Sequence, residues 1–287
     1  MGTASALRAA IHRRGIVMAP GAMDSLTARL VERAGFPAVY MTGLGATASR
    51  LGTPDIGLLS QTEMTEHARN MARAVSIPII ADADTGYGGP SNIHRTVREH
   101  VQAGVAAIHL EDQVAPKRCG QLAGIRLLEA EEAAARLQCA IEARGNDDLL
   151  IIGRTDAMAA AGPDEAIRRA KLYQSAGVDL VFVDGIKTVR EVEAVAKGVS
   201  GPKVVSIVDG NETVRLTARD LEEMGFQVVL YAVTALFAAM KGVDRALAHL
   251  MAAGTPNGGP AAASYQELSD IVDLGFHQGL DGRYGRG

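Results

Sequence analysis

The stretch that decides the fold is QAGVAAIHLED, residues 102–112. It starts at the end of an amphipathic helical pattern, passes through a glycine and a short apolar run, and ends in two acids. A glycine in this place is typical of the residue that follows a helix. A short, continuously apolar run is typical of a strand that is buried on both faces. This stretch therefore predicts a helix, then a buried strand, then a polar strand end.

The same pattern recurs as RAGF at 33–36, SAGV at 175–178 and EMGF at 223–226, each before another apolar run. Such repetition predicts a series of strand–helix units. The predicted strands are Ile16–Ala19, Ala38–Thr42, Pro78–Asp82, Ala106–Glu111, Leu149–Arg154, Leu180–Asp184, Lys203–Ile207 and Val228–Ala232. The predicted helices cover about 24–34, 61–74, 91–103, 129–144, 163–176, 188–197, 217–224 and 234–252.

Eight such units in about 240 residues predict a (β/α)₈ TIM barrel. An open doubly wound sheet has the same local pattern and is the alternative. We expect one barrel domain over residues 1–287, with its core at about 15–252 and a linker and helical extension at 253–287. That extension should hold a short helix at about 264–274 and a frayed end at GLDGRYGRG. Asp24, Ser91 and Pro163 should mark helix starts.

Composition restricts the class of protein. The formal net charge of −4 gives nucleic acid little to bind, and no apolar stretch is long enough to span a bilayer. The first residues lack the apolar core of a signal peptide. Cys119 and Cys139 are too few for a disulfide scaffold. We therefore expect a cytoplasmic protein that binds neither nucleic acid nor membrane.

Acidic residues gather where the predicted strands end. In a barrel these ends meet at one mouth, which holds the active site. The carboxylates expected there are Asp55, Asp82, Asp84 and Glu111. Such crowding favours a hard cation with oxygen ligands, Mg²⁺ or else Mn²⁺. The alternative is that an acid caps the helix that follows it, and it applies to Asp84, Asp112 and Asp156.

The long loop after the fourth strand brackets a cysteine with two cations, in the order Lys117, Arg118, Cys119 and Gly120. Nearby positive charge lowers the pKa of a thiol, which could then act as an acid or base near neutral pH. The alternative is an incidental loop cysteine. Cys139 lies within a predicted helix and is interpreted as a packing residue.

Arg154 ends the fifth strand, where a guanidinium could clamp a substrate carboxylate. A structural ion pair with one of the acids is the alternative. The DTGYGG stretch at 84–89 lacks the lysine and spacing of a phosphate loop and is weak evidence for one. His109 fits a core position as well as a site position.

Five segments together resemble the isocitrate lyase/phosphoenolpyruvate mutase superfamily. They are MAPGAMDSLTARL at 18–30, VYMTGLGATASRLGTPDIG at 39–57, ADADTGYG at 81–88, IHLEDQVAPKRCG at 108–120 and GRTDA at 153–157. The resemblance covers about residues 15–250 and is strongest to the short lyases: methylisocitrate lyase, dimethylmalate lyase and oxaloacetate hydrolase. It implies a (β/α)₈ barrel whose final helix is swapped between subunits, usually in a homotetramer built as a dimer of dimers.

The resemblance also implies roles for individual residues. Mg²⁺ would be bound mainly by Asp82, with Asp55, Asp84 and Glu111 acting through water. Thr42, Gly43 and Leu44 would hold the carboxylate and carbonyl oxygen of a small carboxylate substrate, and Arg154 would clamp it. Lys117, Arg118, Cys119 and Gly120 would belong to a mobile covering loop in which Cys119 is the general acid. Tyr40 would take part in deprotonating the substrate hydroxyl.

Four positions depart from the methylisocitrate lyase pattern: Leu44, Gln121, Asp184 and Ser206. All four would shape the distal part of the substrate pocket, and they argue against methylisocitrate itself as the substrate.

The sequence thus predicts a Mg²⁺-dependent carbon–carbon lyase that cleaves a small 2-hydroxy di- or tricarboxylate to a 2-oxo acid and a second carboxylate. Oxaloacetate decarboxylation or hydrolysis, or carboxyphosphonoenolpyruvate-type phosphonomutase chemistry, is the alternative on the same metal site. Retention of Cys119 favours the lyase. A barrel that binds without catalysis would be expected to have lost these carboxylates or the loop cysteine.

Overall fold

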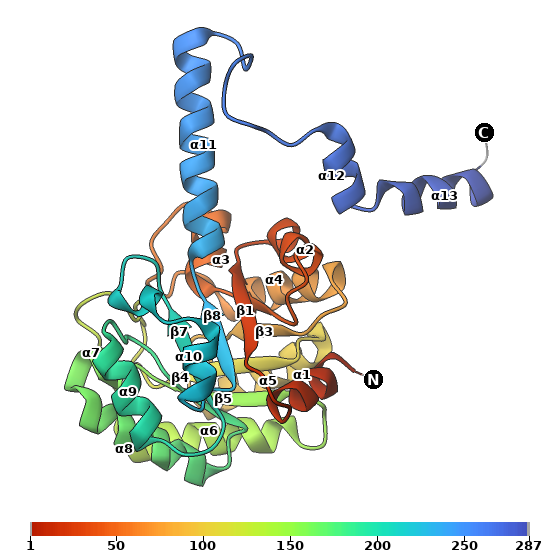
Figure 1. The fold of residues 1–287 in the computed structure, drawn as a ribbon. Coiled ribbons are helices and arrows are strands. Elements are labelled where there is room, and N and C mark those ends of the chain that lie inside the picture. Colours follow the sequence, from red (N-terminus) through yellow and green to blue (C-terminus); the bar gives the residue numbers. More distant parts are fainter. Residues whose placement is uncertain (1, 286–287) are drawn as a thin grey trace.

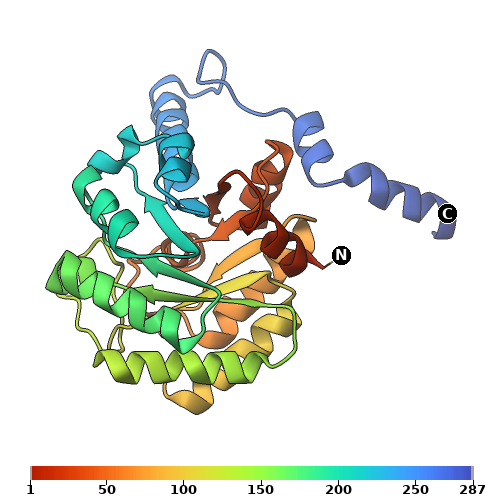
Figure 2. The same ribbon diagram turned by 60° about the horizontal axis from the view of Figure 1, so that its bottom comes forward.

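The apolar runs form eight parallel strands that close into a barrel, because β1 pairs with both β2 and β8 (Figures 1 and 2). This computed structural model describes residues 2–285. The strands are β1 (Val17–Ala22), β2 (Val39–Met41), β3 (Ile79–Asp82), β4 (Ala107–Glu111), β5 (Leu150–Thr155), β6 (Leu180–Val183), β7 (Lys203–Ile207) and β8 (Val228–Tyr231). The (β/α)₈ prediction is confirmed, and the open-sheet alternative is wrong.

The helices surround the barrel and extend beyond it (Figure 1). They are α1 (Thr3–Ile11), α2 (Ser25–Arg33), α3 (Gly43–Leu51), α4 (Gln61–Ala74), α5 (Pro90–Ala103), α6 (Ala130–Arg144), α7 (Ala157–Ala161), α8 (Pro163–Ala176), α9 (Val189–Gly198), η1 (Glu212–Arg215), α10 (Ala218–Glu223), α11 (Thr234–Ala253), α12 (Tyr265–Ile271) and α13 (Leu274–Tyr284).

The repeated glycines end helices as the sequence predicts. Gly35, Gly104, Gly177 and Gly225 follow α2, α5, α8 and α10, with φ of 86°, 82°, 97° and 82°. A positive φ is easy for glycine and costly for residues with a Cβ. Each glycine therefore reverses the chain from a helix into the next strand.

Two apolar layers hold the barrel together. The larger lies between the strands and the outer helices, and the smaller fills the barrel interior. Leu7 and Ile11 of α1 belong to the interior layer, so α1 closes the barrel at the amino-terminal ends of the strands. Neither α1 nor α3, which begins directly after β2, was predicted from the sequence.

The predicted helix starts are partly confirmed. The Asp24 carboxylate accepts a hydrogen bond from Thr27 N at 2.7 Å, and Pro163 opens α8. The start assigned to Ser91 is wrong, because α5 begins at Pro90 after the capping residue Gly89. Proline suits the first helical position because an N–H group there would have no hydrogen-bond partner within the helix, so its absence costs nothing.

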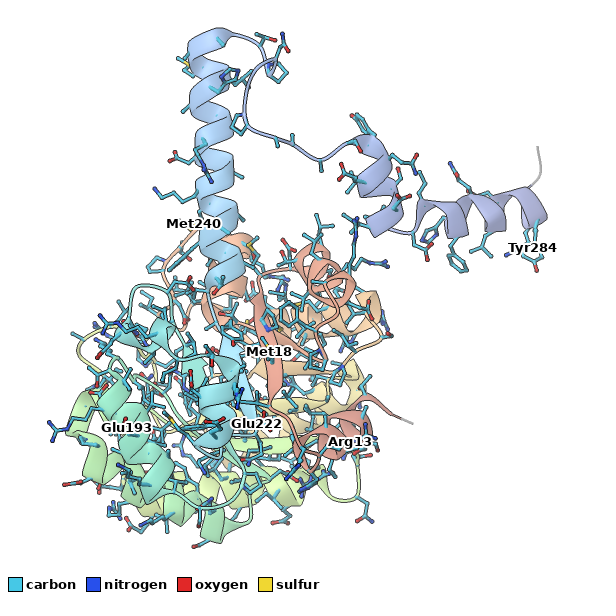
Figure 3. All side chains as sticks on the ribbon, in the orientation of Figure 1. Arg13, Met18, Glu193, Glu222, Met240 and Tyr284 are labelled. Carbon is cyan, nitrogen blue, oxygen red and sulfur yellow. The ribbon has the colours of Figure 1, made fainter. Side chains whose placement is uncertain are left out.

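The last barrel helix, α11, stands away from the barrel (Figures 1 and 3). Leu236 near its start is buried, whereas its later apolar side chains are exposed; these are Phe237, Met240, Val243, Leu247, Leu250 and Met251. Beside its base lies an apolar groove of about 490 Å³ over β1, β8 and α2, with Met18, Leu30 and Tyr231 among its lining residues. We call this the β1/β8 groove.

The extension after α11 differs from the prediction. The helix expected at 264–274 is α12 and ends earlier, at Ile271, and a second helix, α13, follows after Asp273, which has φ 57°. The end expected to be frayed is helical as far as Tyr284, and residues 286–287 lie outside the described residues. Arg29 of α2 donates to Ile271 O at 3.0 Å, which ties α12 to the barrel. Among the described residues, no helix combines the length and apolar character needed to cross a bilayer.

Candidate active site

A cavity of about 370 Å³ opens at the carboxyl-terminal ends of the strands. The predicted site residues that line it are Tyr40, Thr42, Leu44, Asp55, Asp82, Cys119, Gly120, Gln121, Arg154, Asp184 and Ser206. Residues that line it without having been predicted as site residues are Phe182, Lys187, Val208, Asp209, Asn211, Ala232, Val233 and Phe237. The carboxyl ends of all eight strands are the usual place for a barrel active site.

Lys117 lies buried among the acids at one side of this cavity. Its Nζ is 2.6 Å from Asp55 Oδ1 and 2.7 Å from Asp84 Oδ1. Lys117 is 4% exposed, so these contacts are shielded from water. An ammonium group here offsets the repulsion between the two carboxylates.

The turn after β3 gives Asp82 and Asp84 their orientation. The strand ends at Asp82, and Asp84 has φ 47°, so simple strand alternation does not extend through both residues. Asp84 N donates to Asp82 Oδ1 at 2.9 Å, which fixes the Asp82 carboxylate relative to the backbone of the turn. Burial raises the pKa of Asp84 to about 6, against the opposing effect of Lys117. Its carboxylate contacts Lys117, so the alternative of a helix cap does not apply to Asp84.

His109 and Tyr40 form a buried pair beside Asp82. The Tyr40 hydroxyl lies 3.1 Å from His109 Nε2. Burial lowers the pKa of His109 to about 4, so its ring is neutral near pH 7. His109 Nδ1 is 3.7 Å from Asp82 Oδ1, which is too long for a hydrogen bond. His109 therefore faces the site and the barrel interior at once.

Arg154 crosses the cavity floor in contact with three acids. Its Nη2 lies 2.6 Å from Asp184 Oδ2 and 2.8 Å from Asp156 Oδ1, and its Nε lies 3.4 Å from Glu111 Oε2. The structural ion-pair alternative is thus realised, although the guanidinium also lines the cavity. Asp156 precedes α7 but makes no side-chain capping bond, because its carboxylate is used by Arg154.

The loop between β4 and α6 covers the cavity, and residues 113–127 are called the covering loop below. Gln113 pairs with Leu127 at its base, and the Gln113 amide exchanges hydrogen bonds with Arg118 N and Arg118 O at 2.9 and 2.8 Å. Cys119 N donates to Asp55 O at 3.0 Å. These contacts dock the loop against the mouth of the barrel.

Two further features position Gly120 and Gln121 of the covering loop. Asn211 Nδ2 donates to Gln121 Oε1 at 3.1 Å. A Cβ on Gly120 would lie 2.5 Å from Asp184 Oδ2 and 2.6 Å from Asp156 Oδ1, so a larger residue does not fit. Sequence reasoning missed Asn211, since it follows β7 in a short turn without any motif.

The predicted chemistry of the loop needs two corrections. Burial raises the pKa of Cys119 to about 11, so the lowering expected from its cationic neighbours is wrong. Lys117 is used by Asp55 and Asp84, and the Arg118 guanidinium turns back to Ala123 O at 3.4 Å. Arg118 was predicted as a site residue, but it does not line the cavity.

The start of α3 brings backbone N–H groups to the cavity. The Thr42 hydroxyl accepts from Gly45 N at 3.3 Å and so caps α3. Helix starts carry N–H groups without partners and attract negative charge. A Cβ on Gly43 would collide with the Asp82 carboxylate, so the glycine allows α3 to approach Asp82 closely. Thr42, Gly43 and Leu44 thus lie where a substrate carboxylate could be bound.

The acids fit a hard divalent cation that retains several water molecules. Among the described residues, no three His, Cys, Asp or Glu side chains are close enough together to hold a metal by themselves. Mg²⁺ in proteins commonly takes one or two carboxylates and keeps its waters. Both Glu111 oxygens are buried and accept no hydrogen bond from the described residues, although burial raises the pKa of this carboxyl. Asp82, Asp55, Asp84 and Glu111 could therefore surround a hydrated ion.

Comparisons with known proteins match the whole chain. The family model described as phosphoenolpyruvate phosphomutase matches residues 7–251. The 2,3-dimethylmalate lyase of Eubacterium barkeri is 37% identical over 288 residues, covering 100% of both chains. The structure of oxaloacetate acetylhydrolase with 3,3-difluorooxalacetate has TM-score 0.94 at 30% identity, covering 100% of this chain and 98% of that one. Phosphonopyruvate hydrolase with oxalate and Mg²⁺ has TM-score 0.90 at 31% identity, covering 100% of both chains.

Proposed function

This chain belongs to the phosphoenolpyruvate phosphomutase family of the PEP mutase/isocitrate lyase superfamily, and on that premise we propose that it is a Mg²⁺-dependent carbon–carbon lyase of a small 2-hydroxy acid. The observation that carries the proposal is the position of Cys119. Its thiol lines the same cavity as Asp82 and Arg154, on a loop docked over the mouth. A proton donor at that place suits a reaction that leaves a carbanion.

The residues have defined roles in this reaction. Asp82 would hold the cation, with Asp55, Asp84 and Glu111 around its waters. The cation would supply electrophilic stabilisation of the 2-hydroxyl oxygen as negative charge develops there. The N–H groups at the start of α3 and the Arg154 guanidinium would bind the substrate carboxylates.

Proton transfer begins and ends the cleavage. Tyr40 takes the proton of the substrate 2-hydroxyl and passes its own to the neutral His109 Nε2, 3.1 Å away. The C2–O electron pair forms a carbonyl, the C2–C3 bond breaks, and its electrons move onto C3. The Cys119 thiol then protonates C3, which releases a 2-oxo acid and a second carboxylate. A thiol that is neutral near pH 7 holds the proton that this step requires.

The distal part of the cavity favours a substrate with alkyl substituents over a tricarboxylate. The cavity lining there includes the apolar residues Leu44, Val208, Ala232, Val233 and Phe237. Arg154 is already paired with three acids, and the exposed Lys187 is the other cation among the lining residues. A third carboxylate would find little positive charge there. We therefore propose an alkyl-substituted malate, the type of acid named for the dimethylmalate lyase relative.

The second candidate is hydrolysis or decarboxylation of oxaloacetate on the same site. The likeness to oxaloacetate acetylhydrolase favours it, and phosphonomutase chemistry is a further form of this alternative. These reactions would use the same cation site but would not all need a proton from Cys119.

The test is to incubate the protein with Mg²⁺ and methylisocitrate, 2,3-dimethylmalate, citramalate or oxaloacetate, and to follow the 2-oxo acid by coupled reduction. We expect product from a substituted malate, abolished by chelator and reduced by at least about 100-fold in Cys119→Ser. Cys139→Ser is the matched control and should leave the rate unchanged. Consumption of oxaloacetate that survives Cys119→Ser would overturn the lyase in favour of the second candidate.

We also propose that the protein assembles as a homotetramer in which α11 of one copy fills the β1/β8 groove of another. The apolar side chains exposed along α11 and the apolar lining of the groove support this pairing. Leu247→Asp should lower the sedimentation coefficient, because the assembly should dissociate into smaller species. Arg219→Ala on the outer surface of α10 should leave the coefficient unchanged. An unchanged sedimentation coefficient in Leu247→Asp would contradict the exchange of α11.

A further inference from the structure

Asp112 is a buried acid that does not line the substrate cavity. It follows Glu111 at the end of β4 but is directed toward α8, and it is 2% exposed. Its carboxylate accepts four hydrogen bonds. The donors are Thr155 Oγ1 at 2.7 Å, Asp156 N at 3.0 Å, Arg169 Nη1 at 3.1 Å and the Tyr173 hydroxyl at 2.7 Å.

These donors come from two different parts of the fold. Arg169 and Tyr173 lie on α8, and Arg169 is itself held by Glu165 at 2.7 Å. The other two donors are Thr155, the last residue of β5, and Asp156, which opens the turn after it. Asp112 therefore connects that turn to a long helix. Because all four contacts are donated to it, the carboxylate is fixed as an acceptor and is not a proton donor in this arrangement.

The turn that Asp112 holds is the one that orients Arg154. The Asp156 carboxylate accepts two hydrogen bonds from Arg154, from Nη2 to Oδ1 at 2.8 Å and from Nε to Oδ2 at 3.2 Å. Thr155 Oγ1 also accepts from Ala157 N at 3.2 Å, which fixes the start of α7. If the turn moves, the carboxylate that clamps Arg154 moves with it.

Asp112 also anchors the covering loop through its backbone. Leu128 N donates to Asp112 O at 2.8 Å, directly after the pair between Gln113 and Leu127. One residue thus fixes both the end of β5, which carries Arg154, and the base of the loop, which carries Cys119.

We propose that Asp112 is a positioning residue that sets the guanidinium of Arg154 and the base of the covering loop relative to each other. Its kinetic consequence rests on the proposed function, since it concerns the cavity that Arg154 and Cys119 line. Its structural consequence does not, and can be measured without any substrate.

Asp179 provides a matched control at the other end of the barrel. Its carboxylate accepts hydrogen bonds from Arg8 Nη1 at 2.7 Å, Arg144 Nη1 at 2.5 Å and Ile151 N at 2.9 Å, much as the Asp112 carboxylate accepts from its partners. It lies just before β6, at the amino-terminal ends of the strands and away from the cavity. Asp179→Asn removes a comparable charge without touching the turn after β5.

The experiment compares hydrogen exchange by mass spectrometry in the wild type, Asp112→Asn and Asp179→Asn. In Asp112→Asn we expect exchange to accelerate about 10-fold in the peptide covering 153–159, as the loss of charge-assisted bonds implies. Exchange should accelerate less in the peptide covering 113–128, because the bond from Leu128 N to the Asp112 carbonyl is retained. In Asp179→Asn those peptides should exchange as in the wild type. Unchanged exchange in Asp112→Asn, or equal acceleration in Asp179→Asn, would overturn the inference.

Kinetics supply the second readout, with a conservative rescue. Thr155→Val removes the hydroxyl that binds Asp112, whereas Thr155→Ser keeps it. With the acid that the wild type cleaves, we expect KM to rise about 10-fold in Asp112→Asn and Thr155→Val, and to stay near the wild-type value in Thr155→Ser and Asp179→Asn. Equal KM values in Thr155→Val and Thr155→Ser would contradict a positioning role. If no acid is cleaved by the wild type, the proposed function fails while hydrogen exchange still decides this inference.

Discussion

The two ends of the barrel differ in how many buried acids they hold and in how those acids are satisfied. At the base, α1 fills the interior with apolar side chains such as Leu7, and Asp179 is matched by donors on all sides. At the mouth, Asp55, Asp82 and Asp84 crowd together, and Glu111 is buried without a hydrogen bond from the described residues. Unsatisfied buried acids lower stability and persist where they have a task. The comparison separates the part of the molecule that maintains the fold from the part that performs chemistry.

The most severe way to test this separation is Asp82→Ala. We expect kcat/KM for the cleaved acid to fall by about 1000-fold, since the proposed main ligand of the cation is lost. The melting temperature should change little. The cost of burying the Asp82 carboxylate is lost, but so is its attraction to Lys117 and Arg154, which lowers its pKa. Steady-state kinetics and thermal unfolding followed by circular dichroism check both values. A clear fall in melting temperature would mean that the mouth also maintains the fold.

The corresponding change at the base is Leu7→Ala. Leu7 is 1% exposed within the interior layer, so its truncation should lower the free energy of unfolding by about 3 kcal/mol. The kcat of the folded enzyme should be unchanged, because α1 is at the opposite end from the cavity. Urea unfolding and kinetics at low temperature measure the two effects. A loss of kcat that exceeds the unfolded fraction would break the comparison.

A smaller effect is expected from Gly120→Ala in the covering loop. The new Cβ would lie 2.5 Å from Asp184 Oδ2, so the loop could not dock as it does here. We expect the cleavage rate to fall by about 100-fold with little change in unfolding free energy. Gly275→Ala on α13, where a Cβ meets nothing within 4 Å, is the control and should change neither quantity. Wild-type kinetics in Gly120→Ala would show that loop docking is not needed for turnover.

The smallest effect should come from Arg8→Ala at the base. Its ion pair with Asp179 is partly open to solvent, with the Arg8 side chain 41% exposed. Exposed pairs contribute little, so the free energy of unfolding should fall by less than about 1 kcal/mol. Urea unfolding at two salt concentrations would measure this. A loss as large as that of Leu7→Ala would mean that charge, and not apolar packing, holds the base together.

Much of the barrel could be predicted because its signals are local. A glycine such as Gly104 and the apolar run after it depend on backbone conformation and burial, which neighbouring residues determine. Seven strand ends were predicted to within one residue for the same reason, whereas β1 runs on to Ala22 instead of ending at Ala19. Asp82, Glu111 and Arg154 were likewise predicted as residues near the mouth. The helix α1 was missed although Ala4, Leu7 and Ile11 have helical spacing. Its position across the base of the barrel depends on residues far along the chain, which no local pattern reveals.

The direction and environment of site side chains could not be predicted in the same way. Arg118 was grouped with Lys117 because the two are adjacent, yet one turns outward and the other is buried. The pKa of Cys119 was expected to fall because of those cations, whereas burial raises it. Asp112 was weighed as a helix cap, and its role in joining β4, β5 and α8 depends on contacts across the fold. Such properties arise from tertiary packing and not from spacing along the chain.

The outward position of α11 has a consequence for how the protein behaves on dilution. A groove of about 490 Å³ with an apolar lining is stabilised when something covers it. If the cover is α11 of another copy, association and folding obey mass action together. The melting temperature should then rise with protein concentration, and an enzyme assayed at nanomolar dilution would be a less stable molecule than the same enzyme at the concentration of the cell.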